Sequence, residues 1–89
     1  MSQEGPQPIG QVTHYFDRIG VAAIQLWDTL QVGEWVWFWS DHTNFVQQVE
    51  SMQIDRQPVE VAYAEQSVGV KVIAPVRVGD WVYPYTPES

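Results

Sequence analysis

Residues 32–39 read VGEWVWFW, and this stretch decides the fold. From position 35 onward, tryptophans at odd positions alternate with Val36 and Phe38 at even positions. Successive side chains of a β-strand point to opposite faces, and aromatic and β-branched residues favour strands. Gly33 permits the sharp backbone turn that leads into such a strand. The stretch therefore predicts a strand that begins at a glycine turn and carries indole rings on one face.

A second copy of this pattern lies near the C-terminus, where residues 78–83 read VGDWVY. Gly79 and Asp80 take the places of Gly33 and Glu34. In each copy the carboxylate can accept hydrogen bonds from backbone N–H groups of the turn. The rest of the two halves does not match, so the pattern indicates a turn used twice and not a repeat protein.

The remaining chain shows the same two-residue period in short runs separated by Gly, Pro, Asn and Asp. Six strands are predicted: Ile9–Phe16, Val21–Leu26, Glu34–Ser40, Phe45–Ile54, Ser67–Ile73 and Asp80–Tyr85, with a short extended piece at Val59–Ala62. No window predicts an amphipathic helix, and six strands on so short a chain would leave exposed edges unless the sheet closed. The sequence therefore predicts an all-β fold, a small closed antiparallel β-barrel of about six strands at residues 9–85. Pro-rich tails are expected at residues 1–8 and 86–89.

Alternation also predicts which side chains face inward. In the first strand Val12, His14 and Phe16 share a face, and Gly20 is expected to supply the positive φ of the following hairpin. The core is predicted to include Val12, Ile24, Val36, Phe38, Val68, Val70 and Val82.

Composition excludes several classes of protein. The chain has 89 residues, enough for one domain, and no cysteine, which removes disulfides and thiolate metal sites. The polar N-terminal residues do not resemble a signal peptide, and no apolar run approaches the length of a membrane helix. We therefore expect a cytoplasmic protein without membrane association. Its 11 acidic against 4 basic residues argue against direct nucleic-acid binding by the isolated chain.

Several segments of the chain together carry a family resemblance: IGQVTHYF (9–16), IGVA (19–22), LQVGE (30–34), FVQQVESMQI (45–54), PVE (58–60), QSVGVKV (66–72) and VRVGD (76–80). With these segments on the predicted strands, the chain resembles domain 2 of translational GTPases, the β-barrel of elongation factor Tu. It resembles more closely the small stand-alone translation elongation factor-like proteins that consist of this barrel. A related barrel also occurs as an accessory C-terminal domain in some U32-type peptidases.

The chain departs from the pattern of that family in two places. Glu65 stands where the family usually has glycine, so the turn there must avoid a positive φ or contain a strained residue. The outward positions of the third strand, usually polar in the family, are Trp35, Trp37 and Trp39, while Val36 and Phe38 match the family's inward positions.

The sequence contains few residues that could carry out catalysis. The only lysine is Lys71 and no phosphate-binding loop is present, so GTP hydrolysis is not expected. Ser40, Asp41 and His42 are neighbours in sequence, which does not make a catalytic triad, and His14 is the only other histidine. No catalytic residue, metal ligand or cofactor is therefore predicted, and the protein is not expected to be an enzyme.

The candidate binding site is the outward aromatic surface, composed of Trp35, Trp37, Trp39, Trp81 and Tyr83. Such a surface predicts a non-catalytic module that binds a protein or ribonucleoprotein partner, or a second copy of the chain. The alternative is a translation-associated protein that contacts ribosomal RNA or tRNA, which requires Arg18, Arg56, Lys71 and Arg77 to gather beside the tryptophans. A further alternative is that Pro6, Pro8, Pro84 and Pro87 in the tails cover the indole rings.

Overall fold

The structure, a computed structural model, describes residues 7–87. These residues form ten strands and no helix, and so include no helix able to span a membrane. The strands are β1 (Gly10–Phe16), β2 (Val21–Leu26), β3 (Leu30–Gln31), β4 (Trp35–Trp39), β5 (Asn44–Gln48), β6 (Met52–Ile54), β7 (Gln57–Val59), β8 (Val61–Ala62), β9 (Ser67–Lys71) and β10 (Trp81–Tyr85). The predicted tails lie mostly outside the described residues.

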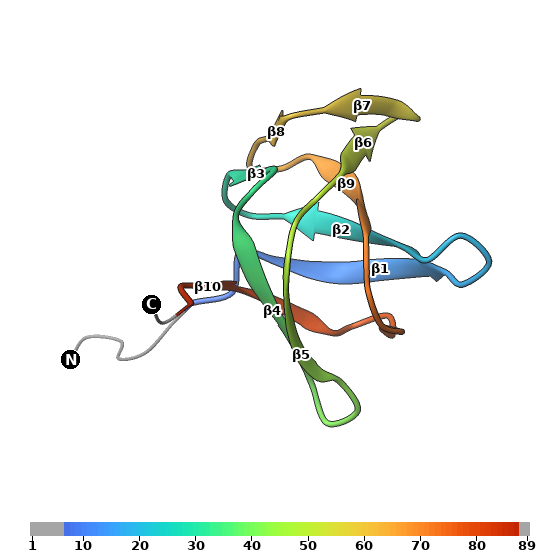
Figure 1. Ribbon diagram of the computed structural model, residues 1–89, viewed down its shortest axis with the longest axis vertical. Coiled ribbons are helices and arrows are strands. Elements are labelled where there is room, and N and C mark those ends of the chain that lie inside the picture. The colour runs from blue at the N-terminus through green and yellow to red at the C-terminus, as the bar shows by residue number, and fades with distance from the viewer. Residues whose placement is uncertain (1–6, 88–89) are drawn as a thin grey trace.

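Eight of the strands form one antiparallel sheet in the order β5-β4-β10-β1-β2-β9-β6-β7, and β3 pairs with β8 in a small second sheet. The large sheet curls into an open half-barrel (Figure 1). The all-β prediction is confirmed. The closed barrel of six strands is wrong, both in the number of strands and in the closure of the sheet.

The strand count differs partly because the predicted strand Phe45–Ile54 changes partner along its length. Its first part, β5, pairs with β4, whereas its last part, β6, pairs with β9 and β7. Between them, Val49 exchanges backbone hydrogen bonds with the turn at Gly33 and Glu34 (both 2.8 Å). In Figure 1 the chain runs from β5 at the bottom of the view to β6 near the top.

The side chain of Gln47 forms hydrogen bonds at a place where a closed barrel would have paired strands. Gln47 of β5 is buried, and its Nε2 donates to the backbone carbonyl of Lys71 (2.9 Å). Its Oε1 accepts from the backbone N–H of Ile73 (2.9 Å). A side-chain amide offers both a donor and an acceptor, so it can satisfy one N–H and one C=O of a strand without a paired backbone. The sheet is therefore joined at this point by one glutamine and not by strand pairing.

The interior of the half-barrel confirms the predicted core. All seven predicted residues are at most 1% exposed, namely Val12, Ile24, Val36, Phe38, Val68, Val70 and Val82. The largest of them, Phe38, is fully buried and stacks on Phe45 of β5 with ring centroids 5.1 Å apart. Burial of such a side chain contributes about 1.5–3 kcal/mol. Strand alternation was thus sufficient to place these seven residues in the core.

One prediction about the first strand is wrong. Val12 is buried, but His14 and Phe16 are exposed. The pairing of β1 with β2 shifts register between Val12 and His14, so Thr13 is an extra residue on β1. A bulge of this kind moves every later side chain to the opposite face, which is why Tyr15 packs against the core instead.

The predicted turn at Gly33 has a specific hydrogen-bond pattern. Gly33 has φ of 100°, and Oε1 of Glu34 accepts from the backbone N–H of Gln31 (2.9 Å). The glycine N–H donates to the carbonyl of Val49 (2.8 Å), and its carbonyl accepts from Nε2 of Gln48 (3.0 Å). The turn is therefore bound to a neighbouring strand through both backbone groups of its glycine.

The second copy has the same geometry. Gly79 has φ of 97°, and Oδ2 of Asp80 accepts from the backbone N–H of Arg77 (2.9 Å). The Gly79 N–H donates to the carbonyl of Val12 (2.8 Å), and its carbonyl accepts from Nε2 of Gln11 (3.1 Å). The similarity of the two turns is confirmed. In each, the glycine forms hydrogen bonds with a valine carbonyl and with the side chain of the glutamine that precedes that valine.

A third turn of this kind has no glycine, and of the two alternatives left open at Glu65 the structure has the strained one. Glu65 occupies the left-handed position with φ of 75°, and Oε1 of Gln66 accepts from the backbone N–H of Tyr63 (2.8 Å). The Glu65 N–H donates to the carbonyl of Leu26 (2.9 Å), as the two glycines donate to their valines. The turn thus keeps the geometry of the two glycine turns with a strained non-glycine residue.

Candidate functional site

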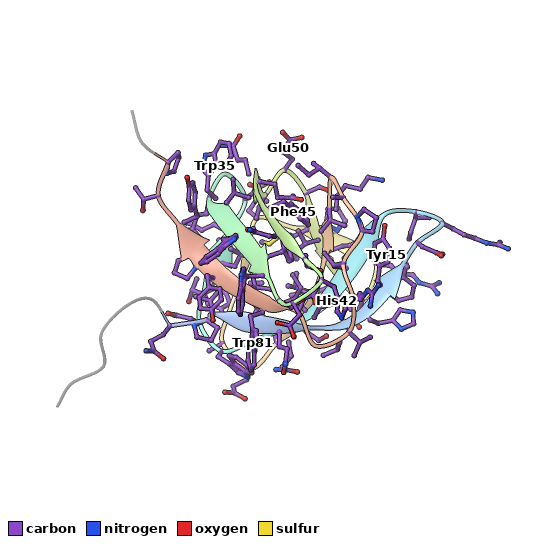
Figure 2. The ribbon with its side chains drawn as sticks, turned by 90° about the horizontal axis from the view of Figure 1, so that it is seen from below. Tyr15, Trp35, His42, Phe45, Glu50 and Trp81 are labelled. Carbon is purple, nitrogen blue, oxygen red and sulfur yellow. The ribbon has the colours of Figure 1, made fainter. Side chains whose placement is uncertain are left out.

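The five predicted surface aromatics share one outer face of β4 and β10, here called the aromatic face: Trp35, Trp37, Trp39, Trp81 and Tyr83. Two direct cross-strand pairs hold it together, Trp81 opposite Trp39 and Tyr83 opposite Trp37. Trp39 is 39% exposed and the other four are half-buried. Figure 2 shows Trp35 and Trp81 on the outside of the strands. The predicted outward direction of these side chains is confirmed.

Trp37 lies at the centre of the aromatic face. Its ring centroid is 5.2 Å from that of Tyr83 and 6.2 Å from that of Trp39, both in tilted arrangements. Its indole N–H donates to Oδ1 of Asn44 on β5 (2.8 Å). Tilted aromatic pairs at these distances are favourable, and the hydrogen bond fixes the orientation of the central ring. The face is therefore ordered before any partner binds.

Two further aromatic residues extend the face. Trp27 follows β2 and lies 6.1 Å from Trp81, ring centroid to centroid, with 43% of its surface exposed. Tyr85 is the cross-strand partner of Trp35 and is 38% exposed. Tyr85 has the same parity as Tyr83, so the alternation could have identified it. Trp27 comes from another part of the sheet, and only the folded structure brings it here.

The prolines considered as a cover for these rings differ in burial. Pro6 lies outside the described residues, Pro8 is half-buried, and Pro84 and Pro87 are exposed. Pro84 and Pro87 line a pocket together with Trp35, at one end of the aromatic face. These two prolines therefore come near the rings at that end.

The residues considered for catalysis or metal binding do not form a cluster. Ser40, Asp41 and His42 lie in the turn between β4 and β5, where Oγ of Ser40 accepts from the backbone N–H of His42 (3.2 Å). His14 is on β1, with its ring centroid 4.3 Å from that of Phe16. Among residues 7–87, no three His, Asp or Glu side chains come close enough to hold a metal ion.

The four basic residues do not gather together beside the tryptophans. None of them lies on β4 or β10, and only Arg77 lies in a turn that leads into one of these strands. Nζ of Lys71 donates to the carbonyl of Ile19 in the β1–β2 turn, and Arg56 lines a pocket with the same isoleucine. The arrangement that RNA binding at the aromatic face would require is therefore not found.

Comparison with known proteins gives a different relationship from the one that the sequence suggested. No family model matches the chain. An uncharacterized protease of Methanocaldococcus jannaschii is 40% identical over 76 residues, which is 84% of this chain but only 19% of the length of that protease.

Two crystal structures share the fold. The C-terminal domain of a Geobacillus thermoleovorans protein assigned as a U32 peptidase has a TM-score of 0.84 at 22% identity, covering 96% of this chain and 100% of that domain. The selenomethionine variant of the same domain has a TM-score of 0.81 at 24% identity, covering 86% and 98%. The predicted membership of the translation factor-like proteins is therefore wrong, and so is the function predicted with it, including its translation-linked alternative. In sequence the chain is similar to a segment of a protease, and in fold to the C-terminal domain of a U32 peptidase.

Proposed function

We propose that this chain is an accessory domain of the U32 peptidase type, without catalytic residues of its own, which docks beside the catalytic part of such a peptidase. The observation that carries the proposal is the fold match over the whole of a U32 peptidase C-terminal domain. The 40% identity to one fifth of a protease supports the same relationship. This proposal replaces the general protein or ribonucleoprotein partner that the sequence predicted.

The aromatic face is the docking surface in this proposal. Tryptophan and tyrosine are favoured at interface hot spots, and an ordered face loses little conformational entropy on binding. Trp37 occupies the centre, where hot spots concentrate, and Trp39 remains 39% exposed. In the relative, the matching segment makes up only 19% of a longer protease, so the rest of such a protein is a partner that this face could contact.

Photo-crosslinking in the native cell tests the proposal. The photoreactive residue p-benzoylphenylalanine is placed at position 39 in place of Trp39, and in a matched control at position 63 in place of Tyr63. Tyr63 is also an exposed aromatic residue, at 58%, but lies outside the aromatic face. Mass spectrometry then identifies the cross-linked peptides, in the same polypeptide or in another.

The expected result is a cross-link from position 39, and not from position 63, to a U32-type catalytic region. The further change Trp37→Ala should reduce it at least about tenfold while the chain stays folded, because Trp37 is half-buried and outside the core. Cross-links from position 39 to ribosomal components, to a second copy of the chain, or to no peptidase would each refute the proposal.

A further inference from the structure

A pocket of about 460 Å³ opens at the end of the aromatic face. Buried Ile9 and Leu30 contribute to its apolar lining. Trp35 of β4 and Tyr85 of β10 also line it, and these two residues lie directly opposite each other in the strand register. The volume is within the range of pockets that hold small molecules or single side chains. The position of Trp35 at the edge of the molecule is visible in Figure 2.

Two carboxylates also line this pocket. Oδ1 of Asp28 accepts from the backbone N–H of Thr29 (2.8 Å), and Oε1 of Glu34 accepts from that of Gln31 (2.9 Å). Neither second carboxylate oxygen has a hydrogen-bond partner among residues 7–87. No lysine or arginine is among the residues that line the pocket. The pocket thus combines negative charge with aromatic rings and contains no internal counter-charge.

We propose that this pocket binds the positively charged side chain of an arginine or lysine in an extended polypeptide. A cation over the face of a tryptophan or tyrosine ring is attracted by the ring electrons, and a carboxylate accepts a charge-assisted hydrogen bond from the same group. The aliphatic part of the side chain packs on Pro84 and Pro87, which line the pocket and are exposed, as such stems do on apolar surfaces. The inference rests on the proposed function, because an accessory domain of a peptidase would meet polypeptides as ligands.

Other ligand classes fit this pocket less well. An anion would be repelled by Asp28, by Glu34 and by the net charge of −7. A purely apolar group would remove water from two carboxylates without replacing their hydrogen bonds, which is unfavourable. A guanidinium or ammonium group can interact with the faces of the aromatic rings and also donate hydrogen bonds to the carboxylates.

The test uses two capped tripeptides that differ only in charge, acetyl-Gly-Arg-Gly-amide and the same peptide with citrulline, the neutral analogue of arginine. Each is titrated into the chain, and binding is followed by ¹⁵N–¹H NMR at the indole N–H of Trp35 and the amide of Thr29. We expect the arginine peptide to bind at least about tenfold more tightly, with shifts centred on the pocket and binding weakened by salt. Equal binding of the two peptides, or shifts centred elsewhere, would overturn the inference.

Single substitutions show which carboxylates contribute to binding of the arginine peptide. Glu34→Gln and Asp28→Asn keep an oxygen that can accept the turn hydrogen bond, so the fold should be preserved while affinity for the arginine peptide falls about threefold to tenfold. Asp41→Asn, which removes one charge from an exposed position outside the pocket, should leave affinity unchanged. An equal loss in all three variants would mean that only the net charge acts, and the inference would fail. Because the titration contains no peptidase, its outcome does not depend on the cross-linking result.

Discussion

The side-chain amide of Gln47 donates a hydrogen bond to the backbone carbonyl of Lys71, 24 positions away along the chain, at 2.9 Å. The same amide accepts from the N–H of Ile73 through its oxygen. These two bonds join β5 to the end of β9 and to the segment that follows it, although β5 and β9 are not paired in the sheet. A polar side chain in a buried position therefore stands in place of strand pairing.

Replacing this amide should be costly. Gln47→Leu removes the side-chain partner of the Lys71 carbonyl and of the Ile73 N–H at a part-buried site, so we expect the free energy of unfolding in urea to fall by about 2 kcal/mol. Gln57→Leu, on an exposed position of β7, is the matched control and should change it by less than about 0.5 kcal/mol. Equal effects of the two substitutions would show that the amide bonds contribute nothing particular.

The left-handed conformation of Glu65 predicts that glycine is preferred there. Glu65→Gly should raise the free energy of unfolding by about 0.5–1 kcal/mol, since relief of strain outweighs the greater freedom of glycine in the unfolded chain. Glu65→Ala keeps the strain and should give no gain, which separates conformation from charge. Chemical denaturation of the three proteins makes the comparison, and stabilisation by alanine equal to that by glycine would contradict the argument.

The glycines of the two related turns should respond in the opposite direction. A Cβ at Gly33 or Gly79 would meet no atom within 4 Å, so only the positive φ opposes alanine at either position. We therefore expect Gly33→Ala and Gly79→Ala each to lower the free energy of unfolding by about 1–2 kcal/mol. Thermal unfolding followed by circular dichroism measures this, and a neutral result at both positions would show that the turns relax away from a positive φ.

The two faces of β4 should differ sharply in their contribution to stability. Phe38→Ala removes a fully buried ring and should cost about 3–5 kcal/mol. Trp39→Ala, the adjacent residue on the opposite face, should cost about 1 kcal/mol or less because its ring is 39% exposed. Urea denaturation of both variants tests the assignment of the faces, and a larger loss for Trp39 would reverse it.

The two carboxylates of the related turns provide a matched pair that differs in burial. Asp80 is 2% exposed and Glu34 is exposed, although each accepts the same backbone hydrogen bond within its turn. Asp80→Ala leaves a donor unpaired in a buried site and should cost about 2 kcal/mol. Glu34→Ala, where water can replace the carboxylate, should cost about 0.5–1 kcal/mol. Losses of equal size would show that burial does not decide the strength of this bond.

The sequence by itself determined the all-β class, the inward side of most strands and the two glycine turns. These properties are local. Alternation follows from the geometry of an extended backbone, which is why Val36 and Phe38 could be assigned to the core and Trp37 to the surface. A left-handed turn next to a carboxylate likewise depends on residues that are adjacent in sequence, as at Gly33 and Gly79.

Only the tertiary structure decided which strands meet. The bulge at Thr13 and the change of partner between β5 and β6 depend on register between distant strands, which short segments do not encode. The arrival of Trp27 beside Trp81, and the pocket bounded by Asp28, Glu34 and Tyr85, likewise depend on how the sheet curls. Even Glu65 is held at a positive φ by its surroundings, because its hydrogen bond to Leu26 and the hydrogen bond from Tyr63 to Gln66 outweigh the local preference of glutamate.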